Sequence, residues 1–436
     1  MSVLLDISPL RSSPAYRRLW WGLGISNFGT QLTVVAVGLQ VYEISASTLS
    51  VGVLGMCALV PLVVLGLYGG ALVDQYDRRR VALLASSGLW LVSIALAVQA
   101  LWHLESVTLL YALVALQSAG FAINNPARSA IIPRLLPREL LASANVLQTV
   151  TWNVALTVGP LLGAVLVAGV DFAAAYAVDV VLFTAALYAL FRLPDLPPTT
   201  AGPGEPNADG ESGAPPKRGL ASVLEGLRYL ATRPNVRMTF VVDLIAMIFA
   251  MPRVLFPAVG VLYLGGGAGT TGLLNAAFAI GAVLAGLLSG RLVGLRWQGR
   301  IITVAIACFG VSVAGFGLML LIVGKHRPAG VVVWALMLCL VFLALCGAAD
   351  AISSVFRQTI LQAATPDNMR GRLQGVFIVV VAGGPRLGDL VLGAQSSWVG
   401  EAGAAIIGGL VCVALVALVT VLQRRFLDYD ALDPRP

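Results

Sequence analysis

Charged side chains are scarce in this chain of 436 residues: only 11% are Asp, Glu, Lys or Arg, whereas 58% are hydrophobic. Soluble globular proteins carry about 25% charged residues. A water-soluble fold of this length cannot bury so much apolar surface, because the exposed surface scales too steeply with size. The composition therefore excludes a soluble protein and predicts one that is embedded in the plasma or inner membrane of a cell.

Residues that build metal sites or catalytic centres are equally few. The chain has two histidines, His103 and His326, and both fall in predicted loops without metal-ligating neighbours. Its five cysteines lie within apolar runs, where they fit packing better than disulfides. The phosphate-binding loop G-x-x-x-x-G-K-[ST] is also missing. We predict no metal, no cofactor, no nucleic-acid partner and no enzymatic activity.

Apolar runs long enough to cross a bilayer, about 20 residues each, recur along almost the whole sequence. The one at 271–293 is the least distinct, because glycine interrupts it often. We predict an all-α integral membrane protein of twelve transmembrane helices in two six-helix bundles, with spans at 19–41, 48–71, 81–102, 106–125, 146–168, 172–191, 238–263, 271–293, 301–323, 329–349, 373–395 and 403–422.

Positive charge is distributed unevenly between the connecting segments. Arginine and lysine cluster before the first span and after every even-numbered span, whereas the alternate loops hold only Lys325 and Arg327. Because cytoplasmic loops carry the excess of positive charge, both termini are predicted in the cytoplasm. An odd number of spans would break this alternation.

A polar segment from Pro194 to Gly219 divides the chain. It is rich in proline, glycine and small polar residues, which is typical of a disordered linker. The apolar spacing from Leu220 to Leu230 then predicts a short amphipathic helix on the membrane surface. We expect an N-terminal bundle over 1–192, a cytoplasmic linker over 193–237 and a C-terminal bundle over 238–436.

The two halves share a pattern after their fourth spans. Three residues of the first half recur in the second with identical spacing: Arg128, Ile131 and Pro137 correspond to Arg357, Ile360 and Pro366. Duplicated six-helix halves are a common plan among transporters. The pattern favours an internal duplication.

The loop after the second span reads GALVDQYDRRR, from Gly70 to Arg80. It resembles the G-x-x-x-D-R-x-G-R-R signature of the major facilitator superfamily, although Gln75 and Asp77 depart from it. The matching positions are Gly70, Asp74, Arg78 and Arg79. The resemblance implies a gate in which the carboxylate caps a neighbouring helix and the arginines tether the bundles. The alternative is that the arginines only set the topology.

Span five contains Gly159, Pro160 and Gly163 in a stretch similar to the antiporter motif of the superfamily's exporters, G-P-x-x-G-G. Proline bends a helix and small residues allow close packing, so a kinked packing helix is the alternative. The stretches 126–133 and 253–258 are similar to the branch that contains enterobactin exporters and macrolide-efflux-like proteins. This resemblance implies export of siderophores or amphipathic drugs.

Five ionisable residues fall inside predicted spans: Asp179, Asp243, Arg253, Arg386 and Asp389. Each costs roughly 2.5–3.5 kcal/mol at bilayer depth unless it has a partner or faces water. We predict that one of the three carboxylates carries a proton, and that the two arginines bind an anionic substrate or act as counter-ions. Fixed ion pairs are the alternative, and Arg386 and Asp389 share a helix face. Asp179, near a helix start, fits the structural role better.

Uncharged polar residues supply further candidates for substrate contacts. Asn27 and Gln31 share one face of the first span, and Gln117 and Asn124 lie on the fourth. Hydrogen bonding between helices is the alternative role for all four.

These features together predict a monomeric secondary active exporter that exchanges a siderophore or an amphipathic drug-like molecule for protons by alternating access. Its partners are the small-molecule substrate, protons and the lipid bilayer. A proton-coupled uptake carrier of the same fold and a non-transporting membrane receptor are the alternatives.

Overall fold

The computed structural model describes residues 7–194, 220–288, 296–364 and 367–430. Within these residues the regular structure is helical, apart from an isolated bridge between Trp297 and Asp430. The first half contains α1 (Ser8–Ser12), α2 (Pro14–Ser45), α3 (Thr48–Gln75), α4 (Arg78–Leu101), α5 (Val107–Leu135), η1 (Arg138–Leu140), α6 (Leu141–Gly169) and α7 (Phe172–Phe191). The second contains α8 (Leu220–Thr232), α9 (Pro234–Ala250), η2 (Pro252–Leu255), α10 (Phe256–Leu262), α11 (Gly267–Leu288), α12 (Gln298–Val323), α13 (Val333–Ala363), α14 (Asp367–Leu422) and η4 (Arg424–Phe426).

Short polar side chains begin several of the long helices. Ser13, Ser106 and Asp171 accept hydrogen bonds from backbone amides in the first turns of α2, α5 and α7. Asp77 does the same for α4 by accepting from the Arg80 amide at 3.0 Å. Such caps satisfy amides that have no partner within the helix. Asp77, which departs from the signature loop, therefore serves as a helix cap.

Eleven segments of the described chain are long and apolar enough to cross a membrane. The last, Gly383–Leu422, has 40 residues, about twice the length that one crossing needs. Gly400 interrupts α14 there with φ 74° and ψ 169°, a conformation that glycine adopts without steric strain. Counting α14 as two crossings confirms the predicted twelve helices.

The seventh crossing is broken. It comprises α9, η2 and α10, and the break falls at Met251, where the backbone leaves the helical region before Pro252. Proline cannot donate the hydrogen bond that would continue the helix. The break places Arg253 on the short 3₁₀ segment between the two helical parts.

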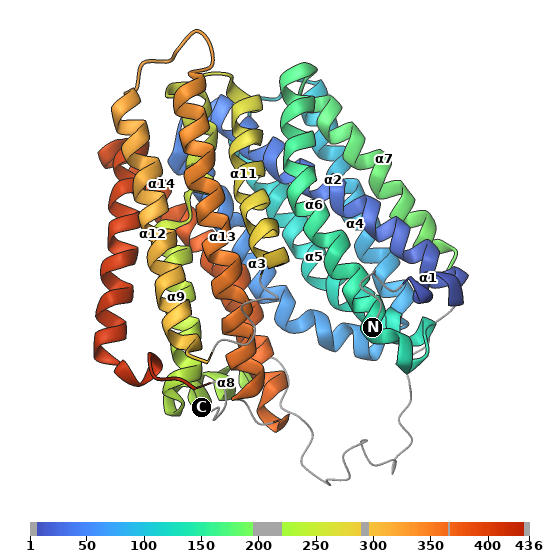
Figure 1. The fold of residues 1–436 in the computed structure, drawn as a ribbon. Coiled ribbons are helices and arrows are strands. Elements are labelled where there is room, and N and C mark those ends of the chain that lie inside the picture. Colours follow the sequence, from blue (N-terminus) through green and yellow to red (C-terminus); the bar gives the residue numbers. More distant parts are fainter. Residues whose placement is uncertain (1–6, 195–219, 289–295, 365–366, 431–436) are drawn as a thin grey trace.

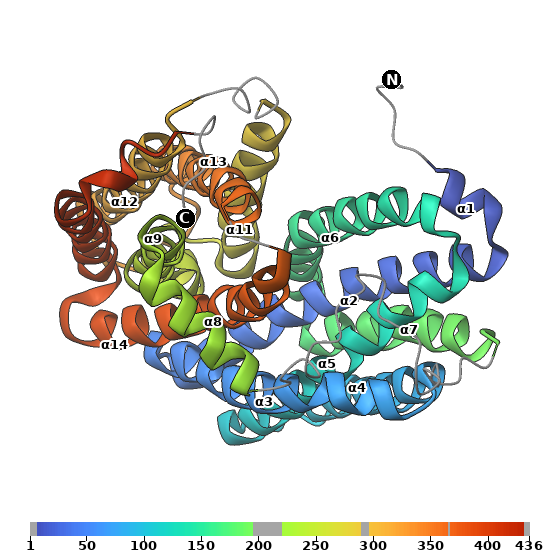
Figure 2. The same ribbon diagram turned by 90° about the horizontal axis from the view of Figure 1, so that it is seen from below.

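The helices form two bundles that lie side by side (Figures 1 and 2). In the first, α2 packs on α6 and α7, and α5 packs on α3 and α4. In the second, α12 packs on α13 and α14, and α11 packs on α13. The bundles touch mainly where α3 meets α14 and where α6 meets α11. The amphipathic helix α8 lies at the lower end in Figure 1, which we call the α8 end.

Two helices run further than predicted. The fourth and tenth spans were expected to end at residues 125 and 349, but α5 continues to Leu135 and α13 to Ala363. Buried Ile131 and Ile360 extend the apolar face of each helix beyond the most hydrophobic stretch. Arg128 and Arg357, predicted as loop residues, therefore lie inside helices.

Close packing of α11 on α13 yields a first testable prediction. A methyl group at Gly281 would overlap the carbonyl oxygen of Ala344, whereas one at Gly286, on the same helix, would meet no atom within 4 Å. Overpacking typically costs about 1–3 kcal/mol. Gly281→Ala should therefore lower the unfolding temperature of the detergent-solubilised protein.

Gly286→Ala is the matched control, because alanine favours a helix by about 1 kcal/mol over glycine where there is room. It should leave the unfolding temperature unchanged or raise it. Equal unfolding temperatures for the two variants would contradict the α11–α13 contact.

Candidate functional site

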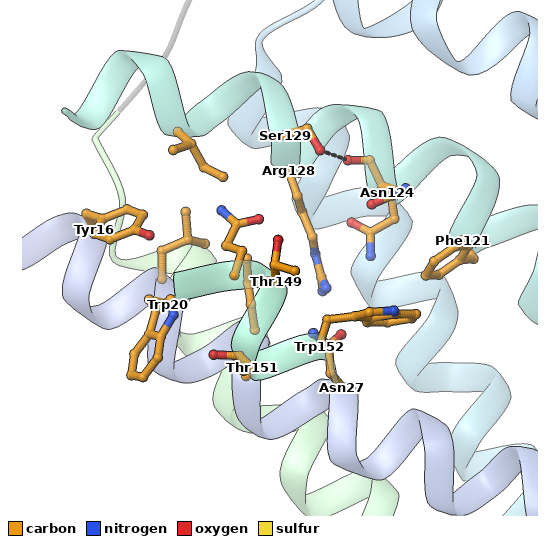
Figure 3. Close-up of a pocket in the computed structure, with 16 residues that line it drawn as sticks. Tyr16, Trp20, Asn27, Phe121, Asn124, Arg128, Ser129, Thr149, Thr151 and Trp152 are labelled. Carbon is orange, nitrogen blue, oxygen red and sulfur yellow. Dashed lines mark hydrogen bonds between the residues drawn. The ribbon is translucent and has the colours of Figure 1, made fainter. Parts of the chain in front are cut away.

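A cavity of about 320 Å³ lies in the first bundle, between the first turns of α2, the last turns of α5 and the first turns of α6. These segments meet towards the α8 end. Its wall combines aromatic and polar side chains. Figure 3 labels Trp20, Phe121, Trp152, Asn27, Arg128 and Thr149, and the wall also includes Asn125 and Gln148. Small-molecule sites are concave and largely apolar, with a few polar groups that fix orientation.

Two of the four predicted polar candidates line this cavity and two do not. Asn27 and Asn124 belong to its wall. Gln31 packs near Gly159, where a methyl group would come within 2.6 Å of the Gln31 Cβ. Gln117 lies two turns before Asn124 on α5 and is not part of the wall.

Arg128 is a cavity residue that sequence reasoning treated only as a loop charge. Its Nη2 donates to the hydroxyl of Ser86 at 3.1 Å, and that hydroxyl donates to the Asn124 side-chain oxygen at 3.1 Å. The guanidinium carbon also lies 5.7 Å from the centre of the Phe183 ring. Arg128 is thus fixed by α4 and α7 and reaches towards Asn27 and Trp152 in Figure 3.

The second bundle contains a buried ion pair between Asp243 of α9 and Arg357 of α13. Arg357 also lies 3.6 Å from the carboxylate of Asp350, two turns earlier on α13. Sequence reasoning identified Asp243 but missed both partners. The seven-residue spacing of Asp350 and Arg357, which puts them on one helix face, was the available signal.

Arg253 joins a second set of charges in the same bundle. Its guanidinium carbon lies 4.7 Å from the centre of the Phe278 ring, and it interacts electrostatically with Asp350 and Asp389. Asp389 in turn interacts with Arg386 and Arg253. Although Arg386 and Asp389 share a helix face, no hydrogen bond joins them in the described structure. Three carboxylates and three arginines thus balance one another across α9, η2, α13 and α14.

Asp389 also faces the other bundle. A methyl group at Gly55 of α3 would lie 3.2 Å from Asp389 Oδ2, and one at Gly52 would overlap the Asp389 carbonyl oxygen. The two glycines let α3 and α14 approach closely. The carboxylate therefore sits where the bundles meet.

Asp179 has a different environment. It is 1% exposed, accepts a hydrogen bond from Ser93 Oγ at 2.8 Å and packs against Gly29 of α2. A side chain at Gly29 would overlap its Oδ1. Asp179 lies outside the cavity wall and joins α2, α4 and α7, an arrangement that fits the structural alternative.

The signature loop lies partly outside the described residues. Gly70 and Asp74 belong to α3, but their side chains fall in the part of the chain that is not described. Arg78 donates to the Ala130 carbonyl oxygen at 3.4 Å, and Arg79 donates to that of Phe191 at 2.7 Å. These contacts join α4 to α5 and to the end of α7 within the first bundle.

The antiporter-like stretch packs against α2. A methyl group at Gly163 would lie 2.8 Å from the Leu32 carbonyl oxygen, and Gly159 abuts Gln31 and Phe28. Pro160, between them, is buried. The small residues permit the close α2–α6 contact that forms one wall of the first bundle.

Glu401 connects the bundles at the end opposite α8. It is 6% exposed and accepts hydrogen bonds from Thr48 Oγ1 of α3 at 3.1 Å, from the Tyr263 hydroxyl at 3.2 Å and from Lys325 Nζ at 3.2 Å. The sequence placed Glu401 in a loop, but it follows Gly400 in α14. We call these four residues the Glu401 junction.

Comparison with known proteins gives a consistent result. The model of a family described as transmembrane secretion effectors matches residues 5–436. The enterobactin exporters EntS of Citrobacter koseri and of Shigella boydii are each 31% identical over 433 residues, which are 98% of this chain and 96% of theirs.

Solved structures share the fold at low identity. A nucleoside transporter, NupG, has a TM-score of 0.67 at 11% identity and covers 95% of this chain and 98% of its own. A POT family transporter in complex with 5-aminolevulinic acid has a TM-score of 0.71 at 12% identity, with 95% and 97% covered. A bacterial homologue of the iron transporter ferroportin has a TM-score of 0.65 at 13% identity, with 95% and 98% covered.

The Asp243–Arg357 pair yields a second prediction. Arg357→Gln leaves a buried carboxylate without its cation, which typically costs roughly 3–5 kcal/mol. The variant should therefore unfold at a markedly lower temperature in detergent. Adding Asp243→Asn should restore most of the loss, because the double variant buries no unpaired charge there.

Arg300→Gln is the control, since its ion pair with Asp428 is exposed on both sides and such pairs contribute about 0–1 kcal/mol. Equal unfolding temperatures for Arg357→Gln and Arg300→Gln, or no recovery in the double variant, would show that the pair does not stabilise the bundle.

Proposed function

The chain belongs to the transmembrane secretion effector family, a family of membrane transporters with the major facilitator fold and not of enzymes, and on this premise we propose that it is a proton-coupled exporter. The observation that carries the proposal is the group of balanced charges in the second bundle, with Asp389 at the contact between bundles. Coupling of proton movement to transport requires a titratable group whose charge influences which end of the two bundles closes. Asp389 lies at the contact between the bundles, where its charge can have this influence.

The electrostatics give a mechanism. A charge inside the membrane is costly unless it is paired or hydrated. When Asp389 is ionised, Arg386 and Arg253 compensate it. Proton uptake would remove that negative charge and leave the group of charges with one positive charge in excess, so the packing of α14 on α3 would change in free energy. Asp243, tied to Arg357, would transmit the change to α9 and α13.

The orientation follows from the charge distribution. The arginine-rich connections lie at the α8 end, so we assign this end to the cytoplasm of a bacterial cell and the chain to the inner membrane. The cavity lies towards that end, whereas the Glu401 junction joins the bundles at the other. The conformation then corresponds to the cytoplasm-facing state from which an exporter loads its substrate.

Two observations support a siderophore or another amphipathic molecule as the substrate. The relatives are named as enterobactin exporters, and the cavity wall combines indole and phenyl rings with amides and a guanidinium group. A wall contributed by one bundle of one chain also agrees with a monomeric transporter.

Proton coupling gives a third prediction. Proteoliposomes with the purified protein should move protons in response to an enterobactin gradient. An imposed pH gradient should drive enterobactin transport against the concentration gradient of enterobactin. Asp389→Asn should abolish the pH-driven accumulation, because a permanently neutral side chain cannot exchange a proton, and Asp243→Asn should reduce it.

Asp428→Asn is the control, since Asp428 is exposed and lies beyond the last span. Unchanged coupling in both Asn variants would refute the proton assignment. Movement of enterobactin in the same direction as the protons would identify an uptake carrier. Absence of any flux with the wild-type protein would reject enterobactin as the substrate.

The Glu401 junction gives a fourth prediction. Glu401→Gln weakens the charged contact with Lys325 and should favour opening of the end opposite α8. A cysteine introduced at Val51, on α3 beside the bundle contact, should then react several-fold faster with a membrane-impermeant maleimide in a background without native cysteines, since about 1 kcal/mol changes a population about fivefold.

Glu43→Gln is the matched control. Glu43 lies near the end of α2, at the same end of the molecule as Glu401, but it is exposed. Equal labelling rates in the Glu401 and Glu43 variants would show that the junction does not hold the bundles together.

A further inference from the structure

Arg128 is a cation without a carboxylate partner in the described structure. Its Nη2 bonds to the Ser86 hydroxyl and its guanidinium lies near the Phe183 ring, but its Nε is buried without a hydrogen-bond partner. No described carboxylate interacts with it electrostatically. An unpaired arginine inside a membrane protein is costly, so its retention calls for a compensating charge.

Comparison of corresponding positions in the two halves identifies where the first half lacks a counter-ion. Arg128 of α5 and Arg357 of α13 occupy corresponding positions of the two halves. Seven residues before Arg357 stands Asp350, whose carboxylate is 3.6 Å away. Seven residues before Arg128 stands Phe121, which lines the cavity. In the first bundle an aromatic ring therefore occupies the position of the counter-ion.

The cavity wall contains buried donors that have no acceptor. Two buried polar atoms of the wall have no hydrogen-bond partner in the described structure, Arg128 Nε and Trp20 Nε1, and both are donors. Trp20, Phe121 and Trp152 add apolar ring surface to the cavity wall. The complementary ligand has a negatively charged acceptor group and an aromatic body.

We propose that Arg128 binds the anionic group of the transported molecule, and that the substrate is an aromatic organic anion held between Trp20, Phe121 and Trp152. This inference rests on the proposed export function and assigns its substrate class. It moves the anion site from Arg253 and Arg386, which the sequence suggested, to the first bundle. Arg253 and Arg386 share the carboxylate of Asp389, whereas no carboxylate of the described residues interacts with Arg128.

Two radiolabelled probes of equal shape test the charge requirement: 2-naphthoate, an anion, and 2-naphthamide, which is neutral. Equilibrium dialysis against the full chain in detergent should show tighter binding of 2-naphthoate. Arg128→Gln should weaken 2-naphthoate binding by about tenfold or more, the loss expected for a charge-assisted hydrogen bond. It should leave 2-naphthamide binding within about twofold, and Arg128→Lys should recover part of the preference by restoring the charge.

Arg134→Gln is the matched control, because Arg134 is an exposed arginine on the same helix and outside the cavity wall. It should keep the preference for 2-naphthoate. Equal loss of both probes in Arg128→Gln would indicate a structural role for Arg128 and overturn the proposal, as would an unchanged preference.

Trp152→Ala separates the ring contact from the charge contact. It should weaken both probes to a similar extent, since both carry the same ring system. If it weakens neither, the aromatic part of the proposal is wrong.

The result is independent of the export assay. Enterobactin flux in proteoliposomes tests the proposed function, whereas the 2-naphthoate preference tests Arg128. Normal flux with no charge preference rejects the Arg128 site alone, and a clear preference without flux rejects the proposed export of enterobactin alone.

Discussion

Charged side chains inside a membrane protein carry a high free-energy cost unless they are paired or hydrated. The two bundles meet that cost differently. The second compensates Arg253, Arg357 and Arg386 with Asp243, Asp350 and Asp389, so its charges remain inside the protein. The first holds Arg128 with a hydroxyl group and a phenyl ring, which orient the guanidinium but do not neutralise it.

Small residues allow the two bundles to approach each other closely. Gly52 and Gly55 let α14 approach α3, and Gly272 of α11 abuts Ala164 of α6. Glu401 adds hydrogen bonds to this contact at the end opposite α8. Because apolar helices gain little from leaving lipid, such a contact can be broken and formed again at modest cost, which alternating access requires.

The sequence was sufficient for features that depend on local composition. Twelve crossings, the break before Pro252 and the amphipathic helix after the linker follow from apolar runs, prolines and spacing. It was insufficient for charges whose partners lie on other helices. Arg357 was assigned to a loop because hydropathy falls before the helix ends, and Glu401 because it follows a short polar turn. Only tertiary packing brings Asp243 to Arg357 and Thr48 to Glu401.

Corresponding positions of the two halves carry one arginine with carboxylate partners and one arginine that has none among the described residues. Helices α5 and α13 carry an arginine at the corresponding position. Two turns earlier, α13 has Asp350, whose carboxylate partners Arg357. At that position α5 has Phe121, which cannot act as a counter-ion to Arg128. In the proposed exchange, an internal carboxylate gives a site whose charge a proton changes, and the position without a carboxylate gives a site whose charge an anionic ligand balances. Coupling the two then requires that both sites act on the contact between the bundles, where α3 meets α14 and α6 meets α11.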